Sequence, residues 1–493
     1  MCRLVEDRND DCDGWPGHVG AVLVRAGRFM LTTVLSVTFT PMTKAPDNRH
    51  RTLPRYWLAG VVALPLLIWW LGWHPGFASS DTIDQWTQGI TGDYRNHHPP
   101  VHTLYLWVIS TGGSRPGLVS LIQLLALTGL LVYAARWLVR AGVPTWVAVG
   151  ATWLLGLSIA IAATTLTLWK DVVFGLFFLW AWIELLALAV DRSQWARTWP
   201  LARLGLALAG VWVFRGNGPI TVILLVLVMA WSQRSHLRRM AIPVVVTAVA
   251  VFVVTVPLNA ALGVTGPGID PAQVFLPDVA ASYVDEPETF TDADIDLLTA
   301  VAPLDVWVER YDCYDSTPLL FDPRFDHTPV RQTPGAYRGL VFSVFTRDLD
   351  TVVAHRVCAA NFVYSPAQPS DSYFHRPPYD TPTNEVGLSR RPISDRAFAV
   401  TDRYWRWAED HLWLTWRPAI IILPALGAVL LFVLAPERRR LLLPATLFLA
   451  HIVNVAATSP AQEFRYAYPL YLVAVLTIPL ATTTSPDTPA TAR

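Results

Sequence analysis

Long apolar runs separated by short charged turns make up most of the chain from residue 56 onward. The runs cover residues 56–74, 117–135, 144–163, 172–190, 219–231, 241–258, 418–435 and 441–457. A helix of about 20 apolar residues crosses the ~30 Å hydrocarbon core of a bilayer. Because most of these runs reach or approach that length, the pattern predicts membrane-spanning helices.

Two apolar pieces are shorter. At about 1.5 Å per residue, residues 101–112 cannot cross a bilayer alone, and we interpret them as an interfacial or re-entrant helix. Residues 201–214 form a further short span. Together the runs predict an all-α polytopic membrane protein with about ten transmembrane helices and a mixed extracytoplasmic domain inserted late in the chain.

Composition agrees with the pattern. Charged residues make up 15% of the 493 residues and hydrophobic residues 53%, whereas a soluble chain carries about 25% charge. Many of the 22 tryptophans lie near the ends of runs, where aromatic side chains meet the membrane interface. The net charge is zero, so nothing indicates a nucleic-acid partner.

Arginines in the short loops orient the runs, since cytoplasmic loops are enriched in basic residues. Arg51 and Arg55 precede the first run, and further arginines mark alternate turns at 136–140, 192–203, 234–239 and 438–440. This places both termini in the cytoplasm. The loop 75–100 and the turns 164–171, 214–218 and 458–466 are then extracytoplasmic.

The same alternation divides the chain. Residues 1–50 are expected to be a cytoplasmic, disordered extension without a convincing cleavable signal, and 483–493 a cytoplasmic tail. Residues 51–258 form an N-terminal transmembrane module, 259–415 an extracytoplasmic domain, and 416–482 the C-terminal transmembrane helices.

The polar region 259–415 contains local structure of its own. A helix start is expected at Thr291–Asp294, and residues 346–364 have helical periodicity. In an oxidising, external location Cys313 and Cys358 can form a disulfide. The alternative is two unpaired thiols.

The first external loop carries the strongest candidate for chemistry. Ser79 or Ser80 is a natural N-cap, so Asp81 falls in the first helical turn, and Asp84 and Gln85 share its face at i+3 and i+4. A carboxylate here can act as a general base on an acceptor hydroxyl. The same position also suits a carboxylate that only caps the helix and offsets its dipole.

Further polar groups interrupt the apolar runs. His97 and His98, followed by Pro99 and Pro100, can bind phosphate, bind a metal or shuttle a proton, or be plain surface polarity. Each external turn holds one basic residue that could bind phosphate or merely anchor the interface. The candidate binding residues in these turns are Lys170, Asp171, Arg215, Asn217, Arg465 and Tyr466. Glu184, within a span, reads as paired or near the inner interface.

These motifs resemble the GT-C superfamily of polyprenyl-phosphate-sugar-dependent glycosyltransferases, which includes protein O-mannosyltransferases and the lipid A aminoarabinose transferase. Asp81 matches the acidic residue of the superfamily's first external loop, and His98-Pro99-Pro100 matches its second element. The three later turns are similar as well. The resemblance covers roughly residues 50–480 and is nearest to uncharacterised bacterial members with a large late external loop.

The resemblance implies transfer of a sugar from a polyprenyl-phosphate donor to a cell-envelope glycan, lipid or protein. Lys170, Arg215 and Arg465 would hold the phosphate, and Asp81 would deprotonate the acceptor. The chain departs from the mannosyltransferases because Asp81 is followed by Thr82, so Asp84 stays an alternative catalytic residue. Without a DxD motif, we expect no metal and no cofactor.

Two other functions stay open. A transporter or flippase of lipid-linked glycans would show repeats and broken helices around a midplane site, and no repeat is visible. A non-enzymatic membrane scaffold would explain region 259–415 but not the matched external charges. The sequence specifies neither the sugar, the acceptor, the lipid length nor the oligomeric state.

Overall fold

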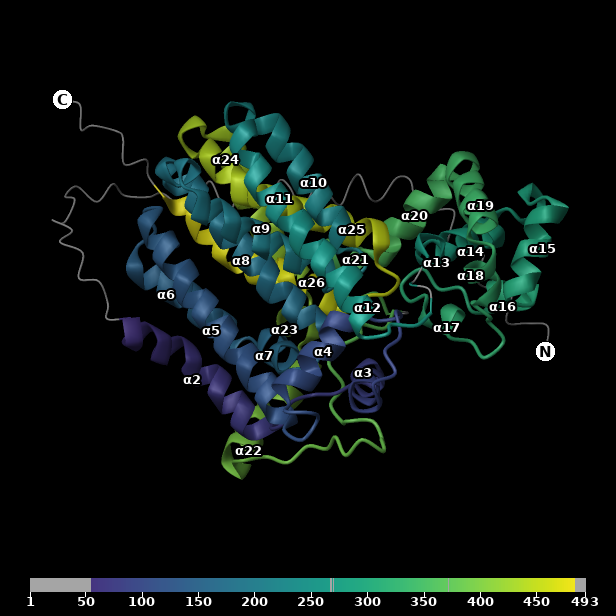
Figure 1. The fold of residues 1–493 in the computed structure, drawn as a ribbon, viewed down its shortest axis with the longest axis horizontal. Helices are drawn as coiled ribbons and strands as arrows, with labels where there is room; N and C mark the ends of the chain where they lie inside the picture. The colour runs from purple at the N-terminus through teal and green to yellow at the C-terminus, as the bar shows by residue number, and fades with distance from the viewer. Residues whose placement is uncertain (1–54, 267, 269, 371, 484–493) are drawn as a thin grey trace. The chain divides into compact units, whose positions relative to one another are not determined.

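The computed structural model describes residues 55–483 except 267, 269 and 371. The expected extension 1–50 and the tail from residue 484 lie outside the described residues. Within the described part, long helices from both halves of the sequence pack into one bundle (Figure 1). Its main helices are α2 (Arg55–Trp73), α5 (Pro116–Arg140), α8 (Lys170–Val190), α9 (Thr198–Val213), α10 (Gly218–Ser232), α11 (Leu237–Val253), α24 (Ala419–Leu434), α25 (Leu442–Thr458) and α26 (Phe464–Thr477).

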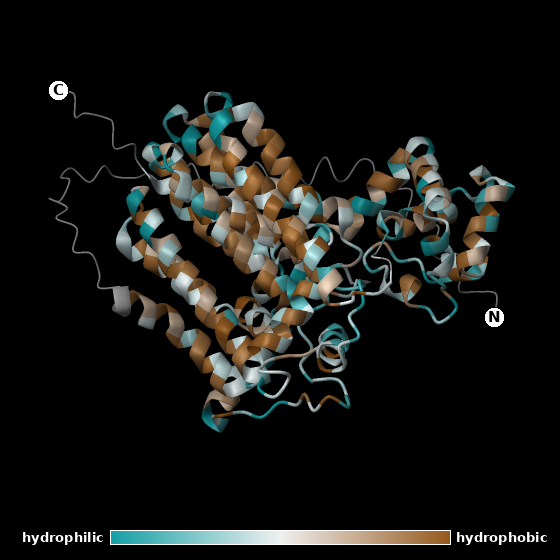
Figure 2. Cartoon of the chain, in the orientation of Figure 1, coloured by the Kyte–Doolittle hydropathy of each residue, from teal (hydrophilic) through white to brown (hydrophobic). Residues whose placement is uncertain are grey.

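The chain is a multi-pass membrane protein. Five described helical segments are long and apolar enough to cross a bilayer, and a bent pair provides a sixth. Five further apolar helices have only 10–17 residues. Apolar residues run along the bundle helices and polar residues gather at their ends and in the late region (Figure 2). About ten spans therefore stays a prediction.

The apolar run 144–163 is not one straight helix, although the bent pair that it forms is together long and apolar enough for one span. It is broken into α6 (Thr145–Leu157) and α7 (Ile159–Leu166), whose axes differ by 61°. Ser158 lies between them in an extended conformation and its hydroxyl accepts a hydrogen bond from Ile161 N–H, so it caps α7. The sequence did not indicate this break, because the residues on both sides of Ser158 are apolar.

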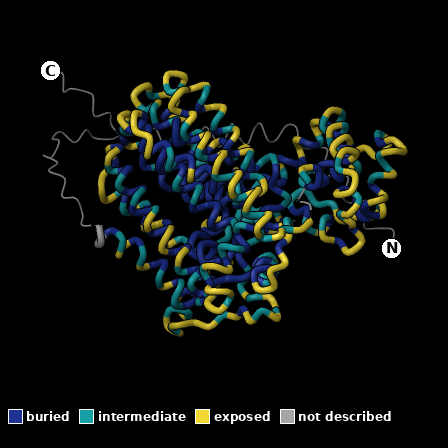
Figure 3. Tube along the Cα trace, viewed as in Figure 1, coloured by how far each residue is buried: buried dark blue, intermediate teal, exposed yellow. Residues whose placement is uncertain are grey.

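Burial differs strongly among the spans (Figure 3). In the span Lys170–Val190, 89% of the apolar window is buried inside the protein, whereas in Arg234–Ala261 only 11% is buried. A buried span positions groups at its ends rigidly, because it packs on all sides. Glu184 in α8 pairs with Arg203, whose Nη2 lies 3.0 Å from its carboxylate.

Two short helices follow α2. The expected helix start is found in α3 (Ser80–Thr91), where Ser79 and Thr82 form a reciprocal capping box. The apolar piece 101–112 forms α4 (Pro100–Ile109), which packs against α3 and α5.

The late region forms its own apolar core between residues 272 and 352. Its main helices are α14 (Leu276–Asp285), α15 (Asp292–Val301), α16 (Leu304–Glu309), α18 (Thr328–Gln332), α19 (Pro334–Arg347) and α20 (Leu349–Ala359). Thr291 caps α15 with Asp294, as expected. The stretch 346–364 is divided at Asp348 and Ala360 instead of forming one helix.

The expectation of a mixed domain is wrong in one respect: among the described residues this region has helices, irregular segments and isolated bridges, but no strand. Cys313 and Cys358 are disulfide-bonded, with Cα atoms 5.7 Å apart. Farther along, Phe362, Phe374 and Trp405 join the core of the helix bundle rather than that of the late region.

Candidate functional site

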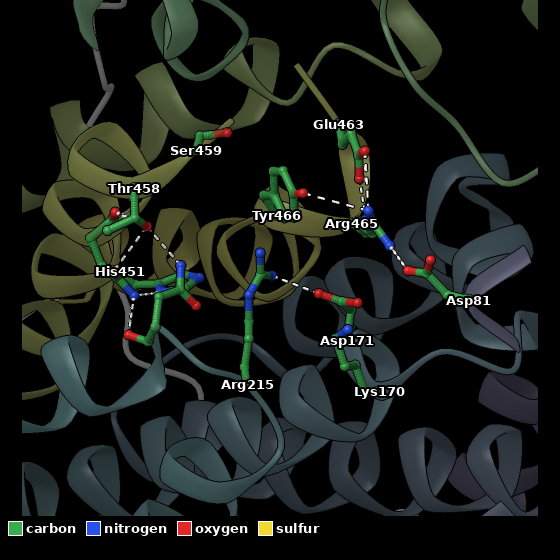
Figure 4. Close-up of polar contacts among 12 residues, drawn as sticks. Asp81, Lys170, Asp171, Arg215, His451, Thr458, Ser459, Glu463, Arg465 and Tyr466 are labelled. Atoms are coloured by element: carbon green, nitrogen blue, oxygen red, sulfur yellow. Dashed lines mark hydrogen bonds and ion pairs between the residues drawn. The ribbon is translucent and has the colours of Figure 1, made fainter. Parts of the chain in front are cut away.

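Four turns that are far apart in the sequence bring polar side chains close together (Figure 4). They precede α3, α8, α10 and α26. Arg465 Nη1 lies 2.8 Å from Asp81 Oδ2, and Lys170 Nζ lies 2.8 Å from His98 Nδ1. Arg215 Nη1 lies 2.7 Å from Asp171 Oδ1, and Asn217 Nδ2 donates to Thr458 Oγ1 at 2.7 Å. The predicted candidates therefore form a connected set.

The start of α3 is fixed to the turn before α8. Trp169 Nε1 donates to Ser79 Oγ at 2.7 Å, and Thr82 Oγ1 donates to Leu168 O at 3.2 Å. The backbone of Phe77 also pairs with the 166–168 segment. Asp81 and Lys170 therefore keep a fixed spacing, because both sit on backbones that are bonded to each other.

Asp81 faces several positive groups. Burial alone would raise the pKa of its carboxyl, but the charges of Arg465 and Lys170 outweigh burial and hold the pKa well below its usual range. Asp81 is therefore ionised at neutral pH. Its side chain keeps 33% of its surface exposed, so a ligand can reach it.

His98 connects the first loop to Lys170. Burial, together with the nearby Lys170 charge, lowers the pKa of His98 to about 3. The ring is therefore neutral at pH 7, and its Nδ1 accepts from Lys170 Nζ. No carboxylate lies within ion-pair distance of Lys170 among the described residues.

Asp84 and Gln85 share a helix with Asp81 but point elsewhere. Asp84 Oδ1 lies 2.8 Å from Arg95 Nη2, and its other oxygen is 4.0 Å from His98 Nε2. Gln85 is buried against His102, with Oε1 and Nδ1 3.0 Å apart. Spacing on a helix therefore identified neighbours of the site, but only Asp81 reaches Arg465.

Arg215 and Arg465 both lie close to the ring of Tyr466. The Arg215 guanidinium lies 4.4 Å from the Tyr466 ring centre and the Arg465 guanidinium 5.3 Å from it. Arg465 also contacts the Trp169 ring at 5.3 Å. Aromatic faces hold guanidinium groups flat while leaving some donors free for a ligand.

Sequence reasoning missed Glu463 and Trp169. Arg465 Nη2 lies 3.1 Å from Glu463 Oε1, so this guanidinium bridges two carboxylates. The two residues are only two positions apart, and Glu463 precedes the helix in an extended conformation, which lets it fold back onto Arg465. A Glu-x-Arg pattern at a helix start is the signal that could have found it.

Asn217 lies in a second polar group. Asn454 Nδ2 donates to Asn217 O and to Thr221 Oγ1, both at 2.9 Å. Thr221 Oγ1 is also 3.0 Å from His451 Nδ1. These buried residues tie α10 to α25 and hold the turn that carries Arg215. They lie in apolar runs where spacing alone gave no signal.

The late region contacts the turn that precedes α26 and carries Arg465. His375 N donates to Gln462 O at 2.8 Å, and Phe464 N donates to His375 O at 3.0 Å. His375 Nε2 lies 2.8 Å from Asp315. Arg417 is fully buried, and its Nη1 donates to Gln462 Oε1 at 2.8 Å. The turn that carries Arg465 is thus held by His375 of the late region and by Arg417, which follows that region.

The site offers a reachable carboxylate beside three cations and no obvious metal centre. Among the described residues, no group of three or more His, Cys, Asp or Glu side chains is placed to hold a metal ion. The cations are suited to an anionic group such as phosphate.

Comparison with known proteins gives a partial match. The profile of a family of unknown function (DUF6020) matches residues 91–320. No curated protein sequence matches the chain.

Two solved structures are similar. One is the S. cerevisiae protein O-mannosyltransferase Pmt1-Pmt2 complex bound to the sugar donor, with 17% identity and a TM-score of 0.37; the match covers 46% of this chain and 36% of that one. The other is ArnT from Cupriavidus metallidurans bound to undecaprenyl phosphate, with 13% identity and a TM-score of 0.32; the match covers 85% of this chain and 78% of that one. Both are enzymes of the superfamily that the motifs resemble.

Proposed function

We propose that this protein transfers a sugar from a polyprenyl-phosphate donor to a hydroxyl of an extracytoplasmic acceptor. The observation that carries the proposal is the meeting of Asp81 with Lys170 and Arg465, which come from three separate turns. A carboxylate beside cations at the end of apolar spans matches a donor with a charged phosphate and a lipid tail. The tail would lie along the spans.

The cations have defined roles in this proposal. Lys170, which lacks a carboxylate partner among the described residues, would bind the donor phosphate first. Arg465 would exchange part of its contact with Asp81 and Glu463 for the phosphate. Arg215, held against Asp171 and Tyr466, would add positive charge nearby. These groups would stabilise the charge that develops on the leaving phosphate.

Asp81 is a weak base while Arg465 and Lys170 hold its pKa down. A bound phosphate would neutralise both cations and raise the pKa of Asp81 toward its ordinary range. Donor binding would thereby activate the base. The carboxylate would then accept the proton of the acceptor hydroxyl. The hydroxyl oxygen would attack the sugar carbon and displace the lipid phosphate, with inversion at that carbon. Asp84, bound to Arg95, is the less favoured alternative.

The remaining assignments follow from position. Gln85, His97 and His98 would shape the pocket from the first loop, and Asn217 would support Arg215. The late region 259–415 would cover the site and help to select the acceptor, since it holds the turn before Arg465. We propose that the reaction needs no metal or cofactor, so EDTA should not reduce transfer.

The function is tested by the envelope glycans of a strain that lacks the gene. The proposal expects a glycan, glycolipid or glycoprotein to lose one sugar, and to regain it when the wild-type gene is restored. An unchanged profile, with the lipid-linked sugar still present at its usual level, would contradict it. Accumulation of a lipid-linked glycan on the cytoplasmic side would instead favour a flippase.

Sidedness needs its own test, because the proposal requires an extracytoplasmic site. Gly216 is exposed in the turn between Arg215 and Asn217. Gly216→Cys should react with a membrane-impermeant maleimide in intact cells whose outer barrier is permeabilised. Labelling only after the inner membrane is broken would place the site in the cytoplasm and overturn the proposal.

A further inference from the structure

A cavity of about 260 Å³ lies beside the site, and the proposed mechanism does not use it. Its walls are formed by Arg95, Asn96 and His97 of the first loop, by Thr265 and nearby glycines, and by Arg331 of α18. The cavity is slightly smaller than the ~300–1,000 Å³ pockets that hold drug-sized ligands. It therefore suits a single phosphate-sized or sugar-sized group.

The cavity walls are built by backbone pairing between the first loop and the chain after α12 (Asn259–Ala261). Thr265 N donates to Tyr94 O at 2.9 Å, and Asn96 N donates to Thr265 O at 3.1 Å. Gly266 has a φ of +77°, and a Cβ at Gly268 would come within 3.1 Å of the Asn96 side chain. Glycine at these two positions lets the backbone approach the loop closely and keeps side chains out of the space.

The charge of the walls is one-sided. The lining residues include two arginines and a histidine but no carboxylate. Arg95 is partly neutralised by Asp84, whereas Arg331 is exposed and forms no ion pair with any described residue. Burial lowers the pKa of His97, so its ring is neutral and adds no charge of its own. A site of this kind favours an anion that Arg331 can bind with two parallel hydrogen bonds.

The cavity also adjoins the reacting groups. His97 forms part of its wall, and the His97 ring lies 4.7 Å from the ring of His98, which contacts Lys170. The donor is expected to approach along the spans, whereas this cavity is lined by residues of the first loop, by Thr265 and by Arg331. A molecule anchored here could extend past His98 toward Asp81.

We propose that this cavity binds a phosphate or carboxylate group of the acceptor, so that the acceptor is an anionic molecule. The assignment to the acceptor rests on the proposed sugar transfer, but the anion site itself does not. Arg331 is its main contact, and Arg95 assists. The bound anion positions the acceptor hydroxyl near Asp81 and contributes to acceptor binding rather than to the chemical step.

The anion site is tested on the purified full-length protein with inorganic pyrophosphate as the probe. Diethyl pyrocarbonate modifies neutral imidazoles, and His97 is exposed in the cavity wall, so peptide mass spectrometry of His97 reports on an anion bound in or beside this cavity. Pyrophosphate should slow the modification of wild-type His97. In Arg331→Gln the concentration for half-protection should rise about tenfold or more, because a charge-assisted contact is lost.

Two control variants separate the alternatives. Arg396 is also exposed and forms no ion pair with a described residue, so Arg396→Gln should keep full protection of His97. Lys170→Gln should also keep full protection of His97, because the cavity is proposed to bind its anion without the cations that hold the donor phosphate. Loss of protection in Lys170→Gln would assign the anion to the donor phosphate and overturn the acceptor assignment. Absence of protection in the wild type, or equal protection in Arg331→Gln, would overturn the anion site.

Restoration of the missing sugar in the deletion strain separates this inference from the proposed function. If the wild-type gene restores the sugar and Arg331→Gln restores little of it, both stand. If Arg331→Gln restores it fully at equal protein level, the acceptor assignment fails while sugar transfer stands. If the wild-type gene changes no glycan, sugar transfer fails and the pyrophosphate result still decides the anion site.

Discussion

Two ionic clusters in this protein use similar residues with opposite electrostatic results. In the Asp81 cluster (Asp81, His98, Lys170, Glu463 and Arg465), two cations hold the pKa of the carboxyl well below its usual range. In the Asp278 cluster (Asp278, Ser282, Arg347, Asp348 and Arg356), burial raises the pKa of Asp278 to about 6, although Arg356 opposes it.

Access to solvent and the number of facing cations explain the difference. The Asp81 side chain keeps 33% of its surface exposed, whereas Asp278 keeps none. Asp278 contacts one arginine inside the core of the late region, and that arginine also donates to Val274 O at 3.2 Å. The closed cluster stabilises the fold, while the open cluster keeps charge available for a ligand.

The largest effect on stability is expected from breaking the closed pair. Arg356→Met leaves Asp278 buried without a counter-charge. Removal of one partner of a buried ion pair lowers the free energy of unfolding by about 3–5 kcal/mol. Thermal unfolding of the purified protein measures it. The double variant Asp278→Leu/Arg356→Met should recover much of the loss. Equal stability of Arg356→Met and wild type would show that the pair is not closed.

In the open cluster, a comparable change should affect transfer more than stability. In the proposed reaction, Lys170→Met removes a cation that would face the developing phosphate charge, and loss of one such donor lowers kcat by about 10²–10³-fold. Envelope sugar transfer measures the activity, and thermal unfolding gives the control. If Lys170→Met instead caused a large loss of stability while the folded fraction kept full transfer activity, the open cluster would have the structural role that we assign to the closed one.

The two clusters should also respond differently to acid. His98, neutral in the fold with a pKa of about 3, contributes stability above pH 6.5 that is lost as pH falls. Asp278, whose pKa is raised from 3.8 to about 6, contributes stability at low pH that is lost as pH rises through 6. Between pH 4 and 6, Asp278→Asn should therefore steepen the acid-induced loss of stability and His98→Asn should reduce it. Parallel pH profiles for both variants would contradict these assignments.

Sequence reasoning reached the open cluster because its residues interrupt apolar runs. Lys170 and Arg465 are charged residues at the ends of apolar spans, and Ser79 as an N-cap predicted the helix that carries Asp81. Alternation of arginine-rich turns then assigned them all to one side. In the structure these turns are in contact through the pairs Asp81–Arg465, His98–Lys170 and Asp171–Arg215.

The pairings inside the cluster could not be predicted in the same way. Glu463 binds Arg465, and Asp84 turns toward Arg95, because tertiary packing decides which neighbours a side chain meets. The break at Ser158 was missed since its flanks are apolar throughout. Asp278 and Arg356 are 78 positions apart in a polar region that contains many aspartates, so the sequence did not indicate which aspartate pairs with Arg356.

The most direct test of the central claim compares two carboxylates in α3. Asp81→Asn and Asp84→Asn each remove one negative charge and keep the side-chain shape. Asp81→Asn should lower sugar transfer in the complemented deletion strain by about 10²–10⁴-fold, the usual contribution of a general base. Asp84→Asn should retain most of it, because Asp84 contacts Arg95 rather than Arg465. Full transfer by Asp81→Asn at wild-type protein level would contradict the account.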